Sequence, residues 1–430
     1  MGYSRSICVR DVVVFLSFMT ATLLVSCSKQ DTINSTNGPG GTQPIISPIP
    51  KTPPAITYPA DNTPLDLAAE VDLGRHLFYD KQLSVDGSTS CASCHQVQNG
   101  FADVLPVSIG FQKQLGKRNA PGLTNVAYNS SFTWDGKFPS LEKHAPGPMF
   151  NSLEMGNNFI NGIDSTRVGD TVGNGYNSKP GNNDTLFLFG RLDGNPKMRS
   201  AIVDQNSPRK DLQNNNYYTL LKKAWGPVTI QATTNGGRAT TTMSAVAFTM
   251  DIIAKSIAAF ERTFISNSSP FDRYNSGDLT AMNANAIRGY QLFIDPGKAN
   301  CISCHSGYNF TDQQYHNNGS VIPMSTDIGR AGITKQDTDK YKFKTPTLRN
   351  VSLTKPYLHD GRIDGQNATA ALFSLLSNYN TGGLHSQNQD PRIKPLSLSD
   401  QDLSDIVEFL KELQDGNFTN ATSLSNPWAN

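Results

Sequence analysis

Residues 91–95 read Cys91-Ala92-Ser93-Cys94-His95, and residues 301–305 repeat the pattern as Cys301-Ile302-Ser303-Cys304-His305. C-x-x-C-H is the attachment sequence of c-type haem, in which both thiols bind vinyl groups of the ring as thioethers. The adjoining histidine binds the iron from one side. Both cysteines must lie on one turn to reach one macrocycle, which the short spacing allows. The two copies predict two covalently bound haems, with His95 and His305 as iron ligands.

The use of the cysteines narrows the alternatives. A C-x-x-C pair alone could be a redox pair or half of a zinc site, and two disulfides would also use all four thiols. The other two of the 6 cysteines, Cys8 and Cys27, lie in the N-terminal region, so no thiol remains for a structural disulfide. A histidine directly after both pairs favours haem.

Composition bounds the class of protein. A length of 430 residues is enough for two or three domains with ample cores. The net charge is +1 and 17% of the residues are charged. Nucleic-acid binding needs a concentrated basic face, so this balance argues against it.

The N-terminus carries the pattern of an export signal. Basic residues precede an apolar run over residues 12–25, which is short for a transmembrane helix. The run ends Leu24-Val25-Ser26-Cys27, which resembles a bacterial lipobox. We therefore expect a signal peptide over residues 1–26 and a protein of the periplasm or cell envelope, anchored to the membrane by lipid on Cys27. Ordinary secretion with an incidental cysteine is the alternative.

The rest of the chain divides by composition and periodicity. Residues 27–60 contain many prolines and no apolar period, which predicts an extended tether. A first domain is expected over residues 61–240, with a loop rich in Gly and Asn inserted at residues 156–216. A second domain is expected over residues 241–416, followed by a tail over residues 417–430.

Apolar residues at helical spacing predict the main helices. The predicted ranges are residues 64–79, 243–264, 283–293 and 397–413, the last with Ser399 as its cap. The residues expected to be buried in the first two are Leu65, Ala68, Ala69, Leu73, Leu77, Ala247, Met250, Ile253, Ile257 and Phe260. Strand signals are sparse, so the protein should be mainly helical.

Several short stretches match one family in order and spacing. They lie at residues 73–80, 118–121, 134–137, 154–155, 258–263, 270–274, 346–351 and 356–361. Two of them are Trp134-Asp135-Gly136-Lys137 and Pro346-Thr347-Leu348-Arg349-Asn350-Val351. With these stretches, the chain from about residue 64 to residue 413 resembles the bacterial di-haem cytochrome c peroxidases, which include the MauG-type enzymes. The resemblance implies a mainly α fold of two cytochrome-c-like helical domains, one c-type haem each, with long loops.

The resemblance implies that the first haem reduces peroxide and that the second stores and passes electrons. Peroxide reduction needs an open position on the iron and an acid/base group above it. Many family members close this position at rest with a histidine sixteen residues after the motif histidine, where this chain has Phe111. We therefore predict a first haem that is open without prior reduction, unless a distant residue closes it.

Three further residues match the family around the first haem. Glu154 matches the distal acid/base, although a lone glutamate is more often a solvated charge. His144 stands where better-known members have Gln. It could act as a base or hydrogen-bond donor to peroxide, or instead bind the iron and close the site. Trp134 matches a tryptophan that relays electrons between the haems, and it can also serve as a core residue.

The second iron needs another axial ligand besides His305. Peroxidases that use methionine place it where this chain has Phe373. A short insertion makes residues 374–380 resemble the segment in which MauG-type enzymes supply a tyrosine, so Tyr379 is the first candidate. Met324 is the second candidate, and simple packing is the alternative role of Tyr379.

The resemblance further implies a calcium ion between the domains. Its ligands would be the side chain of Asn119 and the backbone carbonyls of Thr354 and Pro356, with water completing the shell. An all-oxygen set suits a hard cation. His359 matches a histidine near the second haem that bonds a propionate or the backbone rather than iron. The other histidines are expected to be structural or solvated, namely His76, His316 and His385.

Together these features predict an enzyme that reduces hydrogen peroxide to water with electrons from a small redox protein, such as a mono-haem cytochrome c. One alternative is a MauG-type enzyme that oxidises side chains of a partner protein, which Phe111 and Tyr379 favour. A second alternative is a membrane-tethered di-haem electron carrier without turnover of its own. A homodimer is compatible with each of these functions.

Overall fold

The computed structural model describes most of the chain after residue 46. The described residues are 47–84, 86–156, 159–160, 163–164, 217–225, 229–232, 241–244, 250–320 and 325–429. The predicted signal peptide, the tether up to residue 46 and most of the predicted insertion lie outside these ranges, as do Ala247 and Met324. Within the described ranges, no helix has the length and apolar character needed to span a membrane.

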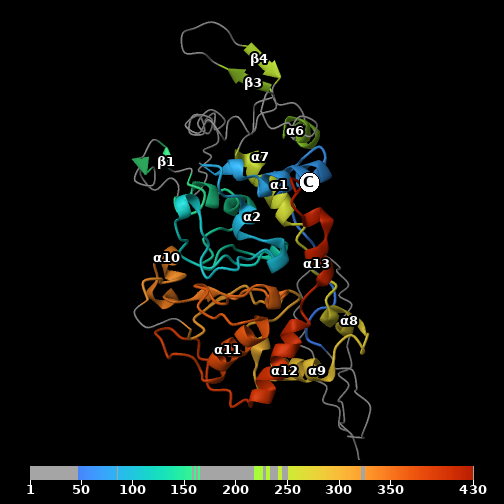
Figure 1. Cartoon of the computed structure of the whole chain (residues 1–430), viewed down its shortest axis with the longest axis vertical. Helices are drawn as coiled ribbons and strands as arrows, with labels where there is room; N and C mark the ends of the chain where they lie inside the picture. The colour runs from blue at the N-terminus through green and yellow to red at the C-terminus, as the bar shows by residue number, and fades with distance from the viewer. Residues whose placement is uncertain are drawn as a thin grey trace, which may run out of the picture. The chain divides into compact units, whose positions relative to one another are not determined.

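Helices dominate the described residues, as the apolar periodicity predicts (Figure 1). They are α1 (Leu67–Tyr79), α2 (Cys91–Cys94), α3 (Leu141–His144), α6 (Tyr217–Trp225), α7 (Met250–Glu261), α8 (Pro270–Ser276), α9 (Ala284–Ile294), α10 (Ala331–Thr334), α11 (Ala368–Asn380), α12 (Asp400–Lys411) and α13 (Gly416–Asn420). The described strands form antiparallel pairs, β1 (Phe159–Ile160) with β2 (Ile163–Asp164), β3 (Thr229–Ala232) with β4 (Thr241–Ser244), and β5 (Tyr315–His316) with β6 (Phe343–Lys344).

The first hydrophobic core forms where α1 packs against α7. Leu73 and Leu77 of α1 and Ile257 of α7 are fully buried in it. Each such side chain stabilises the fold by about 1.5–3 kcal/mol. The two backbones come very close at Gly74, where an added Cβ would lie 1.8 Å from the carbonyl oxygen of Ser256. A glycine at this position therefore sets how near the two helices approach.

The second hydrophobic core forms between α9, α11 and α12 (Figure 1). Ser399 caps the start of α12, as predicted. The rings of Tyr290 and Phe409 pack with their centroids 5.1 Å apart. Here too a glycine marks a helix crossing, since a Cβ on Gly289 would lie 1.9 Å from the carbonyl oxygen of Asp405.

The start of α1 differs from the prediction. Asp66 accepts a hydrogen bond from the backbone N–H of Ala69 at 3.0 Å, so the helix begins at Leu67. Leu65 precedes this cap and is 75% exposed. Ala68 is also exposed. The prediction that these two side chains are buried is therefore wrong.

The second predicted helix is shorter and packs in the other core. α7 begins at Met250, and Met243 lies in β4, where it pairs with Ile230. α7 packs against α1 in the first core, whereas the predicted boundary at residue 241 assigned it to the second domain. That boundary does not match the packing, because the apolar face of α7 fits against α1 at the glycine crossing.

Both ends of the described chain pack onto the cores. Ile49 is 2% exposed within the second core, and Ser47 Oγ lies 2.5 Å from Tyr290 Oη. The predicted tether is therefore held at this point, although residues 51–57 are exposed. Phe418 and Leu424 are buried in the first core, so the predicted tail is part of that core.

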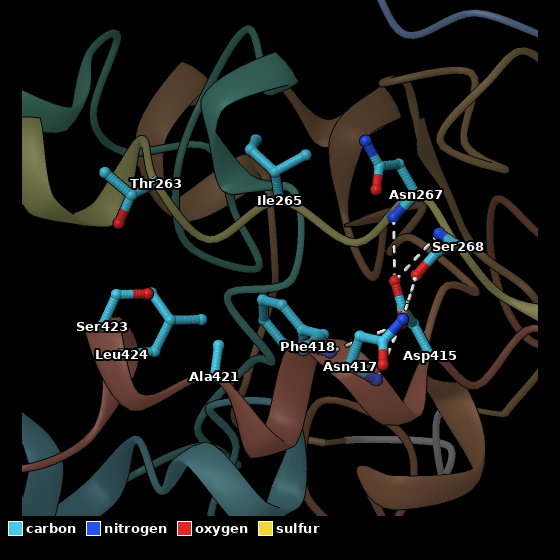
Figure 2. A pocket seen from close by; sticks show the side chains of 10 residues that line it. All are labelled: Thr263, Ile265, Asn267, Ser268, Asp415, Asn417, Phe418, Ala421, Ser423 and Leu424. Atoms are coloured by element: carbon cyan, nitrogen blue, oxygen red, sulfur yellow. Dashed lines mark hydrogen bonds between the residues drawn. The ribbon is translucent and has the colours of Figure 1, made fainter.

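Asp415 stands where the chain returns from the second core to the first. Its carboxylate accepts hydrogen bonds from Ser268 N at 3.0 Å, from Ser268 Oγ at 2.8 Å and from Asn417 N at 3.0 Å. Figure 2 shows these bonds beside a small pocket that Phe418 and Leu424 also line. The backbone N–H of Asp415 donates to Asn350 Oδ1 at 2.7 Å. This bond also holds the chain in place where it passes from the second core to the first.

Candidate functional site

The first C-x-x-C-H motif forms the single turn of α2. The thiols of Cys91 and Cys94 are free. After the turn, His95 Nδ1 lies 2.8 Å from the backbone oxygen of Phe101. A carbonyl partner makes Nδ1 the protonated nitrogen and leaves Nε2 as the atom that can bind a metal.

The second motif repeats this arrangement. Residues 301–303 form a 3-10 turn, and the thiols of Cys301 and Cys304 are free. His305 Nδ1 lies 3.0 Å from the backbone oxygen of Phe310. Burial lowers the pKa of His305, as it does for His95, so both imidazoles are in the neutral form that binds iron. Free thiols next to an oriented, neutral imidazole fit a haem at both motifs.

Two loops meet beside the first motif. The backbone N–H of Phe111 donates to the backbone oxygen of Glu154 at 2.7 Å, and Asn151 Nδ2 donates to Glu154 Oε1 at 2.5 Å. Burial raises the pKa of Cys91 and Cys94, and the charge of Glu154 contributes to both shifts. The Glu154 carboxyl therefore lies within electrostatic reach of the motif. Phe111 and Glu154 are thus brought together beside the first motif.

Burial also acts on Glu154 itself. It raises the pKa of this carboxyl, whereas the hydrogen bond from Asn151 and the charge of Lys137 lower it. A raised pKa keeps more of the carboxyl protonated near neutral pH. This is the state that a general acid needs.

His144 ends the short helix α3. Its ring stacks on Phe132 with centroids 6.0 Å apart and meets Phe138 at 5.4 Å. Its Nδ1 is buried and has no hydrogen-bond partner among the described residues. Burial, then the charges of His95 and Lys137, lower the pKa of His144 to about 4. His144 is therefore neutral at physiological pH, and the effect of His95 on its pKa places the two imidazoles near each other.

Trp134 is hydrogen-bonded to residues from both halves of the chain. Its Nε1–H donates to the backbone oxygen of Asn119 at 2.9 Å, and its own backbone oxygen accepts from Lys344 N at 2.8 Å. Lys344 is 8% exposed, and burial lowers its pKa to about 8. The burial of Lys344 was not predicted from the sequence, because lysine is usually a surface residue. The position of Lys344, two residues before the matched stretch that begins at Pro346, could have indicated that it lies near the site.

Tyr379, near the end of α11, lies close to the second motif. Asn318 Nδ2 donates to its phenol oxygen at 2.8 Å. Burial raises the pKa of Tyr379 to about 12, and the charges of Cys301 and Cys304 act in the same direction. The phenol is therefore within electrostatic reach of both thiols. Phe373 packs against the second core.

The three predicted calcium ligands lie in neighbouring loops. Asn119 is 4% exposed and donates through Nδ2 to the backbone oxygen of Leu105 at 3.1 Å, which leaves Oδ1 for a cation. Thr354 packs close to this loop, since a Cβ on Gly122 would lie 3.1 Å from its Cγ2. Pro356 is buried. The calcium site stays a prediction.

The remaining histidines have contacts of their own or face solvent. His76 Nδ1 lies 2.7 Å from a backbone oxygen one turn earlier in α1. His359 stacks on Phe343 with ring centroids 3.7 Å apart. His316 lies between two aspartates, at 2.8 Å and 2.9 Å. His385 is exposed.

A mainly helical chain with two such motifs has the features of a di-haem protein. The family model described as di-haem cytochrome c peroxidase matches residues 68–179 and 193–280. Over 367 residues the chain is 30% identical to the methylamine utilization protein MauG of Methylorubrum extorquens, covering 84% of this chain and 82% of that protein. Over 299 residues it is 31% identical to the cytochrome c551 peroxidase of Pseudomonas aeruginosa, covering 68% of both. The chain belongs to the di-haem cytochrome c peroxidase family.

A solved structure agrees with this assignment. The fold is similar to that of a MauG-like protein associated with microbial copper homeostasis, with a TM-score of 0.64 and 25% identity. The match covers 88% of this chain and 98% of that one. Membership of the family implies two haems and an oxidoreductase, which confirms these two expectations from the sequence.

Proposed function

We propose that this protein reduces hydrogen peroxide to water with electrons from a small redox protein, such as a mono-haem cytochrome c. The observation that supports the proposal is that Glu154, whose backbone is bonded to Phe111, and His144 both act electrostatically on residues of the first motif. Reduction of one peroxide to two waters consumes two protons and two electrons. The site must therefore move protons as well as electrons, and Glu154 and His144 are placed to do so.

A haem at the first motif would be held by Cys91, Cys94 and His95 Nε2, and it would supply an iron able to reduce peroxide. A neutral His144 can accept a proton from the peroxide, and a protonated Glu154 can donate one to the departing oxygen. The side chain of Phe111 has no ligand atom, so this position leaves the distal side open. Burial of these groups keeps bulk water from competing with peroxide.

Electron entry is proposed near the second motif, with Trp134 as the residue that would relay electrons toward the first. The indole of Trp134 is held by its hydrogen bond to the backbone oxygen of Asn119, and its backbone by the bond from Lys344 N. Tyr379 is proposed as the second ligand of the iron held by His305. The amide of Asn318 would stabilise a negative phenol oxygen.

Other parts of the proposal rest on sequence patterns and on the family. The haems would be attached as thioethers at Cys91, Cys94, Cys301 and Cys304. One calcium ion would be bound by Asn119, Thr354 and Pro356. The lipobox pattern supports export to the periplasm or cell envelope, with a lipid anchor on Cys27.

A MauG-type activity, the oxidation of side chains on a partner protein, is the second candidate. Two observations favour it. Phe111 stands where many peroxidases have a closing histidine, and Tyr379 lies close to the second motif. Rapid consumption of reduced cytochrome c upon addition of peroxide would argue against this candidate.

The substitution Glu154→Gln tests the proposal in the haem-loaded protein. Because Gln keeps the shape but cannot donate the acid proton, we expect kcat/KM for peroxide to fall about 10²–10⁴-fold. The matched control is Glu408→Gln, which alters a partly exposed glutamate paired with Lys411 on α12. An unchanged kcat/KM in Glu154→Gln would show that Glu154 is not the acid, whereas no peroxide turnover in the wild type would support an electron carrier.

A further inference from the structure

Carboxylates gather in the first core, outside the groups described above, where α1, α3 and α7 meet. Glu70 of α1 is 0% exposed and Glu261 of α7 is 4% exposed. Glu142 of α3 is paired with Arg262, whose Nη1 lies 2.6 Å from Glu142 Oε1. Arg262 also donates through Nε to the backbone oxygen of Thr57 at 3.1 Å. Two buried carboxylates and the partly buried Glu142 thus lie within electrostatic reach of one buried guanidinium.

Several oxygens of this group lack partners. Asn62 Nδ2 lies 3.5 Å from Glu70 Oε2, a long contact. Among the described residues, Glu70 Oε1, Glu142 Oε2, Glu261 Oε2 and Asn62 Oδ1 have no hydrogen-bond partner, although all are buried. Buried polar atoms in native proteins are normally hydrogen-bonded to protein or water. These unpaired buried oxygens therefore indicate internal water.

Burial shifts these carboxyls into the physiological pH range. It raises the pKa of Glu70 to about 7, against the effects of Asn62, Arg262 and Lys255. It raises the pKa of Glu261 to about 8, with Arg262 acting in the opposite direction. The charge of Glu142 adds to both shifts. Both groups can hold a proton at neutral pH and release it after a small change in the local field.

The cluster of Glu70, Glu142 and Glu261 also interacts electrostatically with the first motif. After burial, the charge of Glu261 is the largest cause of the raised pKa of Cys91. Glu142 shares the four-residue helix α3 with His144. Because a charge acts over several ångströms in a buried site, an electron added at the first motif should strengthen proton binding at Glu261.

We propose that Glu261 and Glu70, with water on their open oxygens, form a proton reservoir coupled to the redox state of the first haem. The reservoir takes up a proton when the first site is reduced and returns it when peroxide is reduced. Each peroxide takes two electrons, which come from the redox-protein donor, and two protons, which form two waters. Glu261 and Glu70 exchange protons only and are not oxidised. This inference rests on the proposed function, because it needs a haem at the first motif.

The test measures the midpoint potential of the first haem in the haem-loaded protein as a function of pH. In the wild type the potential should fall as pH rises through the range of about 7 to 8, by up to tenfold in the reduction equilibrium constant per pH unit. Glu261→Gln and Glu70→Gln should flatten this dependence, and Glu408→Gln should not. The charged and titratable groups around the reservoir are Tyr58, Asp61, Cys91, Glu142, Asp251, Lys255 and Arg262.

A second measurement covers the case in which a variant does not fold. Reduction of the wild type in weakly buffered solution should remove protons from the medium near pH 7, as reported by an indicator dye. No proton uptake, or wild-type slopes in both variants, would overturn the reservoir. Neither readout uses peroxide turnover. A pH-dependent potential without peroxidase activity would therefore reject the proposed function and keep the reservoir.

The stability of the protein gives an independent check on Glu261. Its pKa is raised in the folded state from the ordinary 4.5 to about 8. The folded state is therefore favoured at low pH, and this advantage is lost as pH rises from 4.5 through 8. Glu261→Gln should show a weaker loss of thermal stability over this range. An identical pH profile in both proteins would contradict the buried, proton-binding state of Glu261.

Discussion

At the scale of single residues, we predict that Phe111 leaves the first site open. Its backbone N–H donates to the backbone oxygen of Glu154 at 2.7 Å, so Phe111 lies next to the candidate acid/base residue. Phe111→His would restore the residue that closes this site in many relatives. We expect the oxidised variant to lose its reaction with one equivalent of peroxide, and to recover it after one-electron reduction. Rapid-mixing absorption spectroscopy measures both.

Phe111→Leu is the control for this change, because leucine removes the ring without adding a ligand atom. It should react with peroxide as fast as the wild type. If the oxidised wild type does not react, its first site is closed at rest. His144 would then be the first residue to examine, since its Nδ1 has no partner among the described residues.

The positions of the candidate site residues were predictable where a short motif marks them. The two C-x-x-C-H stretches predicted which imidazoles lie next to free thiols, whereas the catalytic role of Glu154 stays a prediction. Asn318 and Lys344 were not predictable. Asn318 is 61 residues from Tyr379 in the sequence, and Lys344 is also far from Trp134, so both contacts form only when the chain folds. Single residue types carry no signal for such contacts.

At the scale of elements, the glycine at the crossing of α1 and α7 leaves no room for a side chain. A Cβ on Gly74 would lie 1.8 Å from the backbone oxygen of Ser256, and backbone atoms cannot move aside as side chains do. We expect Gly74→Ala to lower the free energy of unfolding by about 1–3 kcal/mol or more. Denaturant unfolding measures this. Gly416→Ala is the control, since nothing lies within 4 Å of its added Cβ, and equal stability of both variants would contradict the close crossing.

The elements that were predicted well are those with a local start signal. Ser399 caps α12, and Asn283 caps α9, so both helices begin within three residues of the predicted start. α1 and α7 were predicted to be too long. Apolar periodicity continues into residues that the chain uses otherwise, such as Met243 in β4. Periodicity alone does not say where a helix stops.

At the scale of the whole molecule, the two cores are not contiguous in sequence. Ile49 belongs to the second core, whereas α7 and residues near the C-terminus belong to the first. A division at residue 241 assumes that each domain is one uninterrupted stretch. Composition does not predict which segment packs in which core, because the apolar residues of both cores are of the same types. Only long-range contacts, such as those of Asp415, distinguish the two.

The C-terminal residues that pack in the first core also contact a residue bonded to the first motif. Phe418 is 3% exposed and meets Phe101 with ring centroids 5.8 Å apart, and the backbone oxygen of Phe101 is the partner of His95 Nδ1. We expect Phe418→Ala to lower the free energy of unfolding by about 3–5 kcal/mol. It should also disturb the absorption of the first haem more than that of the second. Leu384→Ala, at a side chain that is 51% exposed, is the control.

Equal disturbance of both haems in Phe418→Ala would mean that the C-terminal residues stabilise the molecule only as a whole. A change confined to the first haem would mean that they orient its ligand. The second outcome follows from the contacts, because Phe418 packs in the first core and His305 has its own carbonyl partner, Phe310, which contacts the second core. The end of the chain would then belong to the catalytic half of the molecule, although the helix that precedes it, α12, belongs to the other half.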